Sequence, residues 1–305
     1  YNPSKITDMQ SLTISVTRYV FEPGSVLKPI TFALLLQDKK IHPHDIINTE
    51  NGRYKLGKKV ITDEHPYDYL SAENIIVHSS NIGMAKLAQK LDEIDFYQGL
   101  IEFGFSRKSG IDISDELGGS IPNIHQLRHS TYKATASYGY GMKANFFQLL
   151  SAYNVFNNDG IWIKPSIGKY FQNANGEKQK IEHKKRKKVL DSNIAYIMNH
   201  ILRKVVKEGT GQGAYTEGLR VGGKTGTAHI SIRGRYEDVY NNSFFGFAND
   251  AKERYTIGVT VIEPSPGSHF ASQSAVPVFK DIVDVLVEQK ILVPSFATPK
   301  RVSQN

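Results

Sequence analysis

Apolar residues in the first half of the chain recur at the spacing of helices that bury one face, or run together as in a fully buried helix. The stretches with these patterns are 26–36, 71–77, 82–91, 95–103 and 146–157. Ser71 is a candidate N-cap for the second stretch, and Gly104 is placed to end the fourth. We therefore predict a mainly helical lobe over about residues 25–160, with a short hairpin strand at 55–61 and an irregular segment at 110–123.

In the second half of the chain, short runs rich in β-branched and aromatic residues alternate with turn residues, a pattern typical of strands. These runs are 161–165, 168–171, 220–228, 242–248 and 255–262. Helical spacing returns at 191–206 and again at 276–289, near the end of the chain. Strands at hairpin spacing with helices on either side in sequence predict an antiparallel sheet flanked by helices.

The predicted fold class is therefore α/β, of the α+β type, in a single domain 1–305. Residues 11–20 alternate polar and apolar positions, so we expect a strand that leads into the first helix. The sheet-containing lobe would comprise about residues 1–24 and 161–305. The helical lobe of residues 25–160 would lie between these two parts in sequence.

A serine and a lysine stand three residues apart in Phe21-Glu-Pro-Gly-Ser-Val-Leu-Lys-Pro29, where a helix is predicted to begin. The Pro-Gly pair forms a turn, and the final proline fits the first turn of a helix, where its missing N–H leaves no bond unmade. Because residues i and i+3 share a helix face, the Lys28 amine can reach the Ser25 hydroxyl. Ser25 is the candidate nucleophile and Lys28 its candidate proton acceptor.

Two other segments carry candidate chemistry. Ser79-Ser-Asn81 is a polar turn between two predicted helices and could project toward a cleft. Lys224-Thr-Gly-Thr-Ala228 resembles a strand edge, whose glycine lets another backbone approach closely. Thr225 and Thr227 share one face of that strand, so with the lysine they make a candidate receptor for a carboxylate.

Each motif alone also has an ordinary structural explanation. An N-cap serine followed by a surface lysine, a polar interhelical turn and a lysine-protected edge strand are all common. Ser-x-x-Lys occurs again at Ser130/Lys133 and at Ser166/Lys169, so the bare pattern has little specificity. The order and combination of the three motifs carry the inference.

Composition narrows the function classes. The chain has 305 residues, 40% of them hydrophobic, and a net charge of +8, which suits either an anionic partner or a solvated basic surface. The basic run 184–188 lacks interleaved aromatic residues, so nucleic acid is not expected as a partner. There is no cysteine and no metal-ligand spacing, and we expect no metal and no cofactor. Apolar runs fall short of the ~20 residues that span a membrane.

The three motifs in this order resemble the transpeptidase domain of class B penicillin-binding proteins. The matching stretches are 21–29, 79–86, 103–105, 110–112, 137–141, 224–228 and 243–247, and the likeness extends across nearly the whole chain. Glu22-Pro-Gly-Ser25 and Tyr138-Gly-Tyr-Gly141 resemble the division (septal) branch more than the elongation branch. The resemblance implies the fold shared by penicillin-binding proteins and serine β-lactamases.

The resemblance implies a D,D-transpeptidase that cross-links peptidoglycan stem peptides and is acylated by β-lactam antibiotics. Ser25 would attack the D-Ala-D-Ala carbonyl, and Lys28 would take its proton, which requires a lysine pKa lowered from ~10.4. Ser79 would relay a proton toward the leaving D-alanine. Asn81 would hold Lys28 and the substrate amide.

The remaining site residues follow from the same resemblance. Lys224, Thr225, Gly226 and Thr227 would bind the terminal carboxylate of the substrate or drug. Backbone N–H groups of Ser25 and Thr227 would form the oxyanion hole.

The resemblance also implies a place in the cell. The catalytic domain would lie on the periplasmic side of the inner membrane, and its partners would include a septal glycosyltransferase and other division proteins. The chain opens on Tyr1 without a methionine, so we expect a fragment whose membrane anchor, if any, lies outside it.

Two related functions remain open at this point. A serine β-lactamase would share the three motifs, but the Glu-x-x-Leu-Asn loop of class A enzymes is absent, and Asp112, Asp115 and Glu116 stand in the wrong setting. A non-enzymatic β-lactam sensor would be acylated and would signal without turning over D-Ala-D-Ala peptides.

Overall fold

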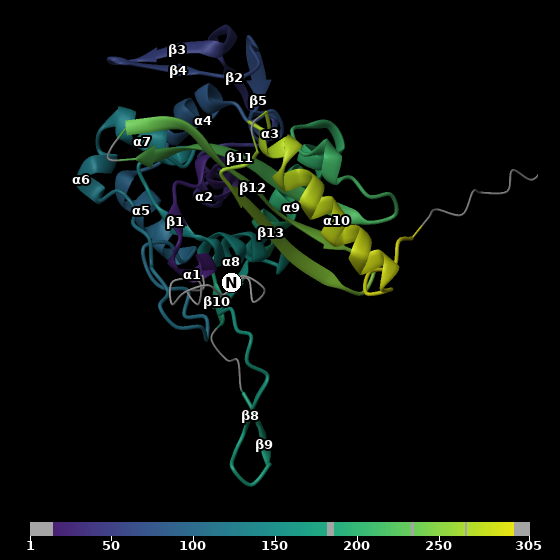
Figure 1. The fold of residues 1–305 in the computed structure, drawn as a ribbon. Helices are drawn as coiled ribbons and strands as arrows, with labels where there is room; N and C mark the ends of the chain where they lie inside the picture. Colours follow the sequence, from purple (N-terminus) through teal and green to yellow (C-terminus); the bar gives the residue numbers. More distant parts are fainter. Residues whose placement is uncertain (1–14, 182–185, 233–234, 266, 296–305) are drawn as a thin grey trace, which may run out of the picture.

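The computed structural model describes residues 15–181, 186–232, 235–265 and 267–295. Its centre is a three-stranded antiparallel sheet in the order β11–β12–β13 (Figure 1). The strands are β11 (Arg220–Ile232), β12 (Arg235–Asn249) and β13 (Arg254–Ile262). All three predicted strands of this sheet are confirmed, and each is longer than its hydrophobic run.

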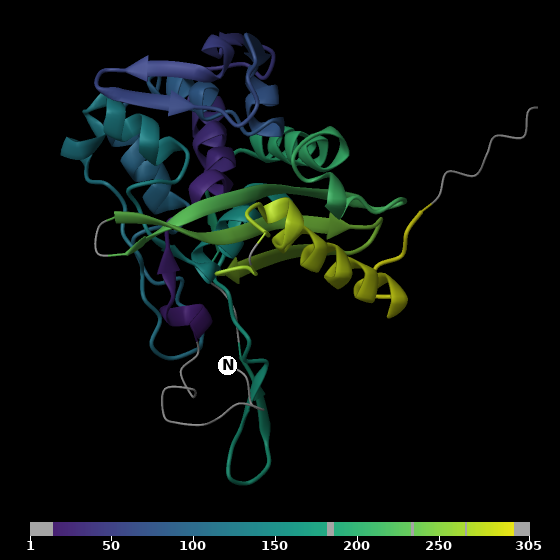
Figure 2. The ribbon, with the colours of Figure 1, turned by 45° about the horizontal axis from the view of Figure 1, so that its top comes forward.

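The two faces of β12 belong to different cores. Phe245 and Phe247 pack into the core shared with α2 and α8, whereas Phe244 and Ala248 pack beneath the C-terminal helix. Alternate residues of a strand point to opposite faces, so both faces need a cover. Helices α8 (Phe146–Asn157) and α9 (Ser192–Glu208) cover one face, and α10 (Ala275–Glu288) covers the other (Figure 2).

Helix α2 (Lys28–Gln37) lies at the middle of the larger core, and every residue from Lys28 to Leu36 is buried. A helix that is apolar nearly all round has no face to give to solvent. Around it lie α4 (Asn81–Ala88), α5 (Glu93–Glu102) and α9. Gly99 of α5 makes one of these contacts close, because a Cβ there would lie 2.5 Å from the Leu34 side chain.

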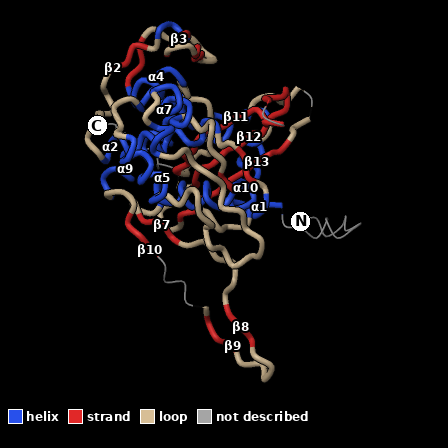
Figure 3. Tube along the Cα trace, turned by 90° about the vertical axis from the view of Figure 1, so that its left-hand side faces the viewer, coloured by secondary structure: helices blue, strands red, loops and turns tan. Residues whose placement is uncertain are grey.

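Short strand pairs extend from both ends of the molecule. The pairs are β2 (Ile46–Asn48) with β5 (Tyr69–Ser71), β3 (Arg53–Leu56) with β4 (Lys59–Thr62), β7 (Ile161–Ile163) with β10 (Arg186–Lys188), and β8 (Tyr170–Gln172) with β9 (Lys178–Lys180). The hairpin expected around 55–61 is present as β3–β4 and lies over α4, but the expected strand range runs across its turn at residues 57–58. The β8–β9 hairpin projects from the opposite end (Figure 3).

The prediction from the sequence was wrong for two segments. Within residues 11–20 the described part is not one strand: Ser15–Arg18 forms helix α1, and only Val20–Phe21 (β1) pairs, with Ala144–Asn145 (β6). Loop contacts override the strand propensity there, since the Leu117 amide donates to the Thr17 carbonyl at 3.0 Å.

The other correction concerns the segment that begins at Ser130, where no helix is predicted from the sequence. It forms helix α7 (Ser130–Ser137), after the single turn α6 (Ile124–Leu127). Serine, threonine and alanine give too weak an apolar period to mark a helix, but their small side chains let α7 pack against α4. The remaining helix, α3 (Ala72–Val77), has the predicted Ser71 cap, which accepts from the Asn74 amide.

None of the helices in the described ranges is both long and apolar enough to cross a membrane.

Candidate active site

Ser25 lies in the short 3₁₀ helix Gly24–Leu27 that leads directly into α2. The turn requires Gly24, whose φ of +58° is a conformation that favours glycine. Strand β11 runs against this turn, because a Cβ on Gly226 would lie only 2.9 Å from Cγ1 of Val26. The glycine of the Lys-Thr-Gly-Thr segment therefore permits the close backbone approach that its sequence indicates.

The second motif of the septal resemblance packs on the same turn. The Gly24 amide donates to the Gly139 carbonyl at 3.1 Å, and the Gly141 amide donates to Oε1 of Glu22 at 2.7 Å. A Cβ on Gly139 would lie 2.0 Å from the Gly24 carbonyl oxygen, so only glycine fits that position. Residues 138–141 thus fix the turn that presents Ser25.

Lys28 occupies the first turn of α2 and has no exposed surface. Its Nζ donates to the Ser79 carbonyl at 2.5 Å and to Ser79 Oγ at 3.1 Å. Burial lowers the pKa of Lys28 to about 7, with Asp63 and Glu64 opposing part of that fall. Near neutral pH, about half of the molecules therefore carry an uncharged amine at this position.

Ser79 stands between α3 and α4 and has a φ of +60°, a conformation that is costly for a residue with a side chain. The residues after it are held by Asp63, which accepts from Ser80 Oγ and from the Asn81 and Ile82 amides at the start of α4. The Asn81 side-chain amide donates to the Thr62 carbonyl at 3.0 Å. Among the described residues, both hydrogen bonds of Lys28 go to Ser79 rather than to Asn81.

Strand β11 forms the opposite wall. Lys224 is fully buried, and burial together with the charge of Lys28 holds its pKa well below the usual value. Its Nζ donates to Thr225 Oγ1 at 3.2 Å, and this hydroxyl also lies 2.8 Å from Thr210 Oγ1. Thr227 Oγ1 accepts from the Ala271 amide at 3.1 Å. A lysine and two hydroxyls thus lie together on this wall.

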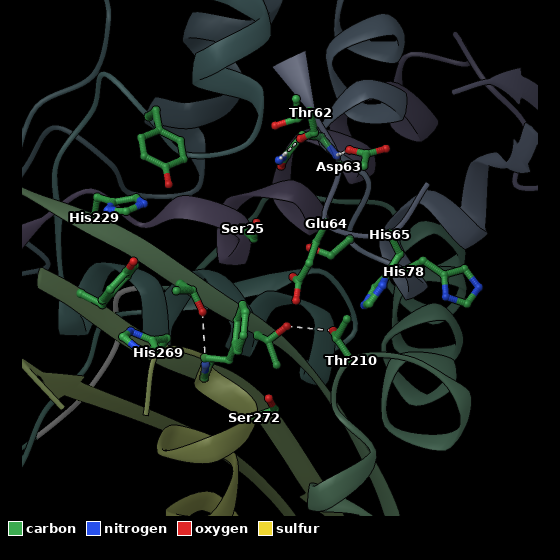
Figure 4. Close-up of a pocket in the computed structure, with 18 residues that line it drawn as sticks. Ser25, Thr62, Asp63, Glu64, His65, His78, Thr210, His229, His269 and Ser272 are labelled. Carbon is green, nitrogen blue, oxygen red and sulfur yellow. Dashed lines mark hydrogen bonds between the residues drawn. The ribbon is translucent and has the colours of Figure 1, made fainter. Parts of the chain in front are cut away.

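The motifs meet at a cleft of about 720 Å³ (Figure 4). Its walls include Ser25, Ser79, Asn81, Thr225 and Thr227, so all three motifs reach one space. Lys28 and Lys224 lie behind the lining, buried but bonded to groups on it. Within the part of the chain that the structure describes, no group of three or more His, Asp or Glu side chains is placed to hold a metal ion.

Most of the other residues that line the cleft were not identified as site residues from the sequence. The full set of these other lining residues is Thr62, Asp63, Glu64, His65, His78, Tyr140, Thr210, His229, Tyr240, His269, Phe270, Ala271 and Ser272. His229 and Tyr240 face each other across β11 and β12, with ring centroids 4.6 Å apart, and extending the predicted hairpin would have paired them. No local pattern marks the loop that follows β4, because its residues reach the cleft only through tertiary packing.

Of the three carboxylates considered as β-lactamase bases, Asp115 does not line the cleft, and the other two are engaged elsewhere. Glu116 accepts from the Ser109 and Gly110 amides and from Asn145 Nδ2. Asp112 accepts from Ser166 Oγ and from the amides of Ile167 and Gly168. Neither lines the cleft, so each serves to hold a loop.

Comparison with known proteins gives consistent results. The penicillin binding protein transpeptidase domain family matches residues 1–284. The probable peptidoglycan D,D-transpeptidase PenA of Neisseria flavescens is 31% identical, over 92% of this chain and 67% of its own. The peptidoglycan D,D-transpeptidase FtsI of Buchnera aphidicola is 29% identical, over 95% of this chain and 50% of its own. The chain spans about half the length of several of these relatives.

Solved structures share the fold as well. The apo transpeptidase domain of Burkholderia pseudomallei penicillin-binding protein 3 superposes with a TM-score of 0.81 at 31% identity, covering 93% of this chain and 83% of that one. Penicillin-binding protein 3 of Mycobacterium tuberculosis, in complex with ampicillin, gives a TM-score of 0.83 at 25% identity, covering 93% and 65%. By its sequence, its fold and the meeting of its three motifs, the chain belongs to the transpeptidase domain family of penicillin-binding proteins.

Proposed function

We propose that this chain is the catalytic domain of a peptidoglycan D,D-transpeptidase and a covalent target of β-lactams. The observation that carries the proposal is the state of Lys28. This lysine follows Ser25 by one helical turn, is fully buried, and has a pKa near neutrality, as a proton acceptor for a serine requires. The names of the relatives PenA and FtsI support the same reaction.

In the proposed acylation, Ser25 Oγ attacks the carbonyl of the penultimate D-alanine and its proton passes to the neutral Lys28 amine. Lys28 already donates to Ser79 Oγ, so Ser79 is placed to carry a proton onward to the leaving D-alanine. The Asn81 side chain lines the same cleft and is available to the substrate amide.

Substrate binding falls to the wall made by β11. Lys224, Thr225 and Thr227 would hold the terminal carboxylate, since hydroxyls and a nearby lysine match its acceptor oxygens. The contact of Gly226 with Val26 supports an oxyanion hole made by the Ser25 and Thr227 backbone N–H groups. In other enzymes one such donor contributes roughly 3–4 kcal/mol to transition-state stabilisation.

The proposal predicts a long-lived adduct with penicillin. Ring opening keeps the leaving nitrogen tethered to the acyl group, where it shields the ester, and neither Asp112 nor Glu116 lines the cleft to activate water. Without a base dedicated to water, deacylation loses roughly 10²–10⁴-fold in rate. We expect intact-mass spectrometry to show one penicilloyl group per chain, persisting for minutes to hours.

The same experiment separates the alternatives. Rapid turnover of excess penicillin would replace the transpeptidase proposal with a β-lactamase. Acylation by penicillin without any release of D-alanine from D-Ala-D-Ala peptides would instead favour a sensor domain.

We further propose that the protein acts in septal wall synthesis on the extracytoplasmic side of the inner membrane, with a septal glycosyltransferase among its partners. The packing of Glu22 and Gly24 against residues 138–141 supports this, because these two stretches carry the resemblance to the division branch. Depleting the full-length protein is then expected to give filaments that replicate but do not divide. Round or swollen cells would assign it to the elongation branch.

A further inference from the structure

Two carboxylates, Asp63 and Glu64, line the cleft, and of these two only Glu64 accepts no hydrogen bond from the described residues. It lies in the loop after β4, exposed, with its carboxylate directed into the cleft between Ser25 and Thr210 (Figure 4). Its neighbour Asp63 is occupied by three donors at the start of α4. Among the described residues, Glu64 takes part in neither a hydrogen bond nor an ion pair, so its oxygens are available to a ligand.

Glu64 acts electrostatically on both buried lysines of the site. It raises the pKa of Lys28 and that of Lys224, in each case against the larger effect of burial. Its carboxylate is also directed toward Thr210, whose hydroxyl lies 2.8 Å from that of Thr225, the residue on β11 that accepts from Lys224 (Figure 4). In the proposed function this is the wall that holds the terminal D-alanine, the part of the donor peptide that leaves.

The amine of the acceptor peptide must approach the acyl-enzyme from the side on which the D-alanine leaves. Cross-linking replaces the amine of the leaving D-alanine by the amine of an acceptor peptide on the same carbonyl carbon, so both amines occupy nearly the same place. A free amine is an ammonium ion at neutral pH. The leaving D-alanine brings a carboxylate that Glu64 repels, whereas an arriving ammonium is attracted.

We propose that Glu64 binds the ammonium group of the acceptor strand and so favours cross-linking over hydrolysis of the acyl-enzyme. This rests on the proposed transpeptidase function and adds a specificity residue to it. The ammonium gives one proton to the neutral Lys28 amine, and a proton passes from Lys28 through Ser79 Oγ, which lines the cleft, to solvent. The nitrogen then forms its bond to the ester carbon, the bond between that carbon and Ser25 Oγ breaks, and the second amine proton returns to Ser25 Oγ.

The test measures how the acyl-enzyme partitions between two nucleophiles. A thioester donor that mimics the stem peptide acylates the protein, and D-alanine amide, which carries the ammonium without the carboxylate, supplies the amine while water competes. In Glu64→Gln we expect the ratio of amide product to hydrolysis product to fall about fivefold to tenfold, as befits one charge-assisted contact at an exposed site. The loss should shrink as ionic strength rises, because salt screens an exposed charge.

A second readout distinguishes a charge effect from damage to the fold. Removing Glu64 removes a charge that raises the pKa of Lys28, so the pH profile of penicillin acylation should move to lower pH in Glu64→Gln. Glu64→Asp should restore part of the amide product. Glu217→Gln, which removes an exposed carboxylate outside the cleft, should leave both the ratio and the pH profile at wild-type values.

The outcomes separate the two proposals. If wild type is not acylated by penicillin, the transpeptidase function fails. If it is acylated and makes amide product but Glu64→Gln keeps the wild-type ratio, the role of Glu64 alone is wrong. If Glu64→Gln loses hydrolysis instead of amide product, Glu64 activates water, and the inference is overturned.

Discussion

Replacing Ser25 by alanine is expected to abolish covalent labelling by penicillin while leaving the domain folded. In the proposed function Ser25 forms the ester, whereas the other cleft hydroxyls beside buried lysines, those of Ser79 and Thr225, relay protons and bind the carboxylate. The cost to stability is small, because loss of a serine near a helix start removes about 0.5–2 kcal/mol. Intact-mass spectrometry after penicillin treatment measures the labelling, and thermal unfolding measures the fold.

The chain provides its own matched controls for this variant. Ser130 and Ser166 also begin Ser-x-x-Lys sequences, but both are exposed and outside the cleft. Ser130→Ala and Ser166→Ala should therefore label like wild type. A penicillin adduct on Ser25→Ala would show that the nucleophile has been assigned to the wrong residue.

Lys28→Arg is expected to slow acylation by roughly 10²–10⁴-fold, the usual contribution of a general base. Arginine keeps the positive charge but cannot give up its proton at any pH at which the protein is folded, so it cannot accept the proton of Ser25. The guanidinium is also bulkier than the amine in a site with no exposed surface. Stopped-flow or quenched labelling with penicillin gives the acylation rate.

The pH dependence of wild type checks the same assignment. With a pKa of about 7, Lys28 is mostly charged below pH 7 and mostly neutral above it. The acylation rate should rise about tenfold per unit as the pH increases toward 7 and level off above it. Lys169→Arg, in the exposed Ser166/Lys169 pair, should keep this profile. Wild-type rates in Lys28→Arg at neutral pH would remove Lys28 from the role of base.

The elements that sequence predicts well are those with a strong periodic signal. Helix α8 begins and ends at the predicted residues, because an apolar face and the asparagine–glutamine capping box mark it locally. The strands of the central sheet are recognisable from their β-branched and aromatic runs, but not their full length. Residues 229–232 of β11 continue a backbone pairing with β12 that needs no apolar pattern. Helix α7 has almost no apolar stripe, so it could not be predicted from hydrophobic periodicity.

The residues of the site fall into two groups in the same way: those in short sequence motifs, and those that only the fold brings to the cleft. Ser25, Lys28, Ser79 and Thr225 were identifiable because they belong to short motifs whose residue types carry the chemistry. The resemblance to penicillin-binding proteins that these motifs carry is confirmed by the family match. Glu64 was not identifiable, since nothing in residues 62–65 indicates that the loop after β4 folds back over the α3–α4 turn. The burial of Lys28, which sets its pKa, is likewise a property of the assembled core.

The contact between Val26 and Gly226 joins residues that are 200 positions apart in the chain. The ribosome therefore synthesises Ser25 long before it synthesises β11, the strand that closes the site. Until β11 docks, we expect Lys28 to be hydrated and to behave as an ordinary ammonium ion with a pKa near ~10.4. If Ser25 is the nucleophile, a partly made chain thus holds it in an inert form, and we expect it to become reactive only when folding is complete. Penicillin given during synthesis should consequently label finished molecules and spare nascent ones.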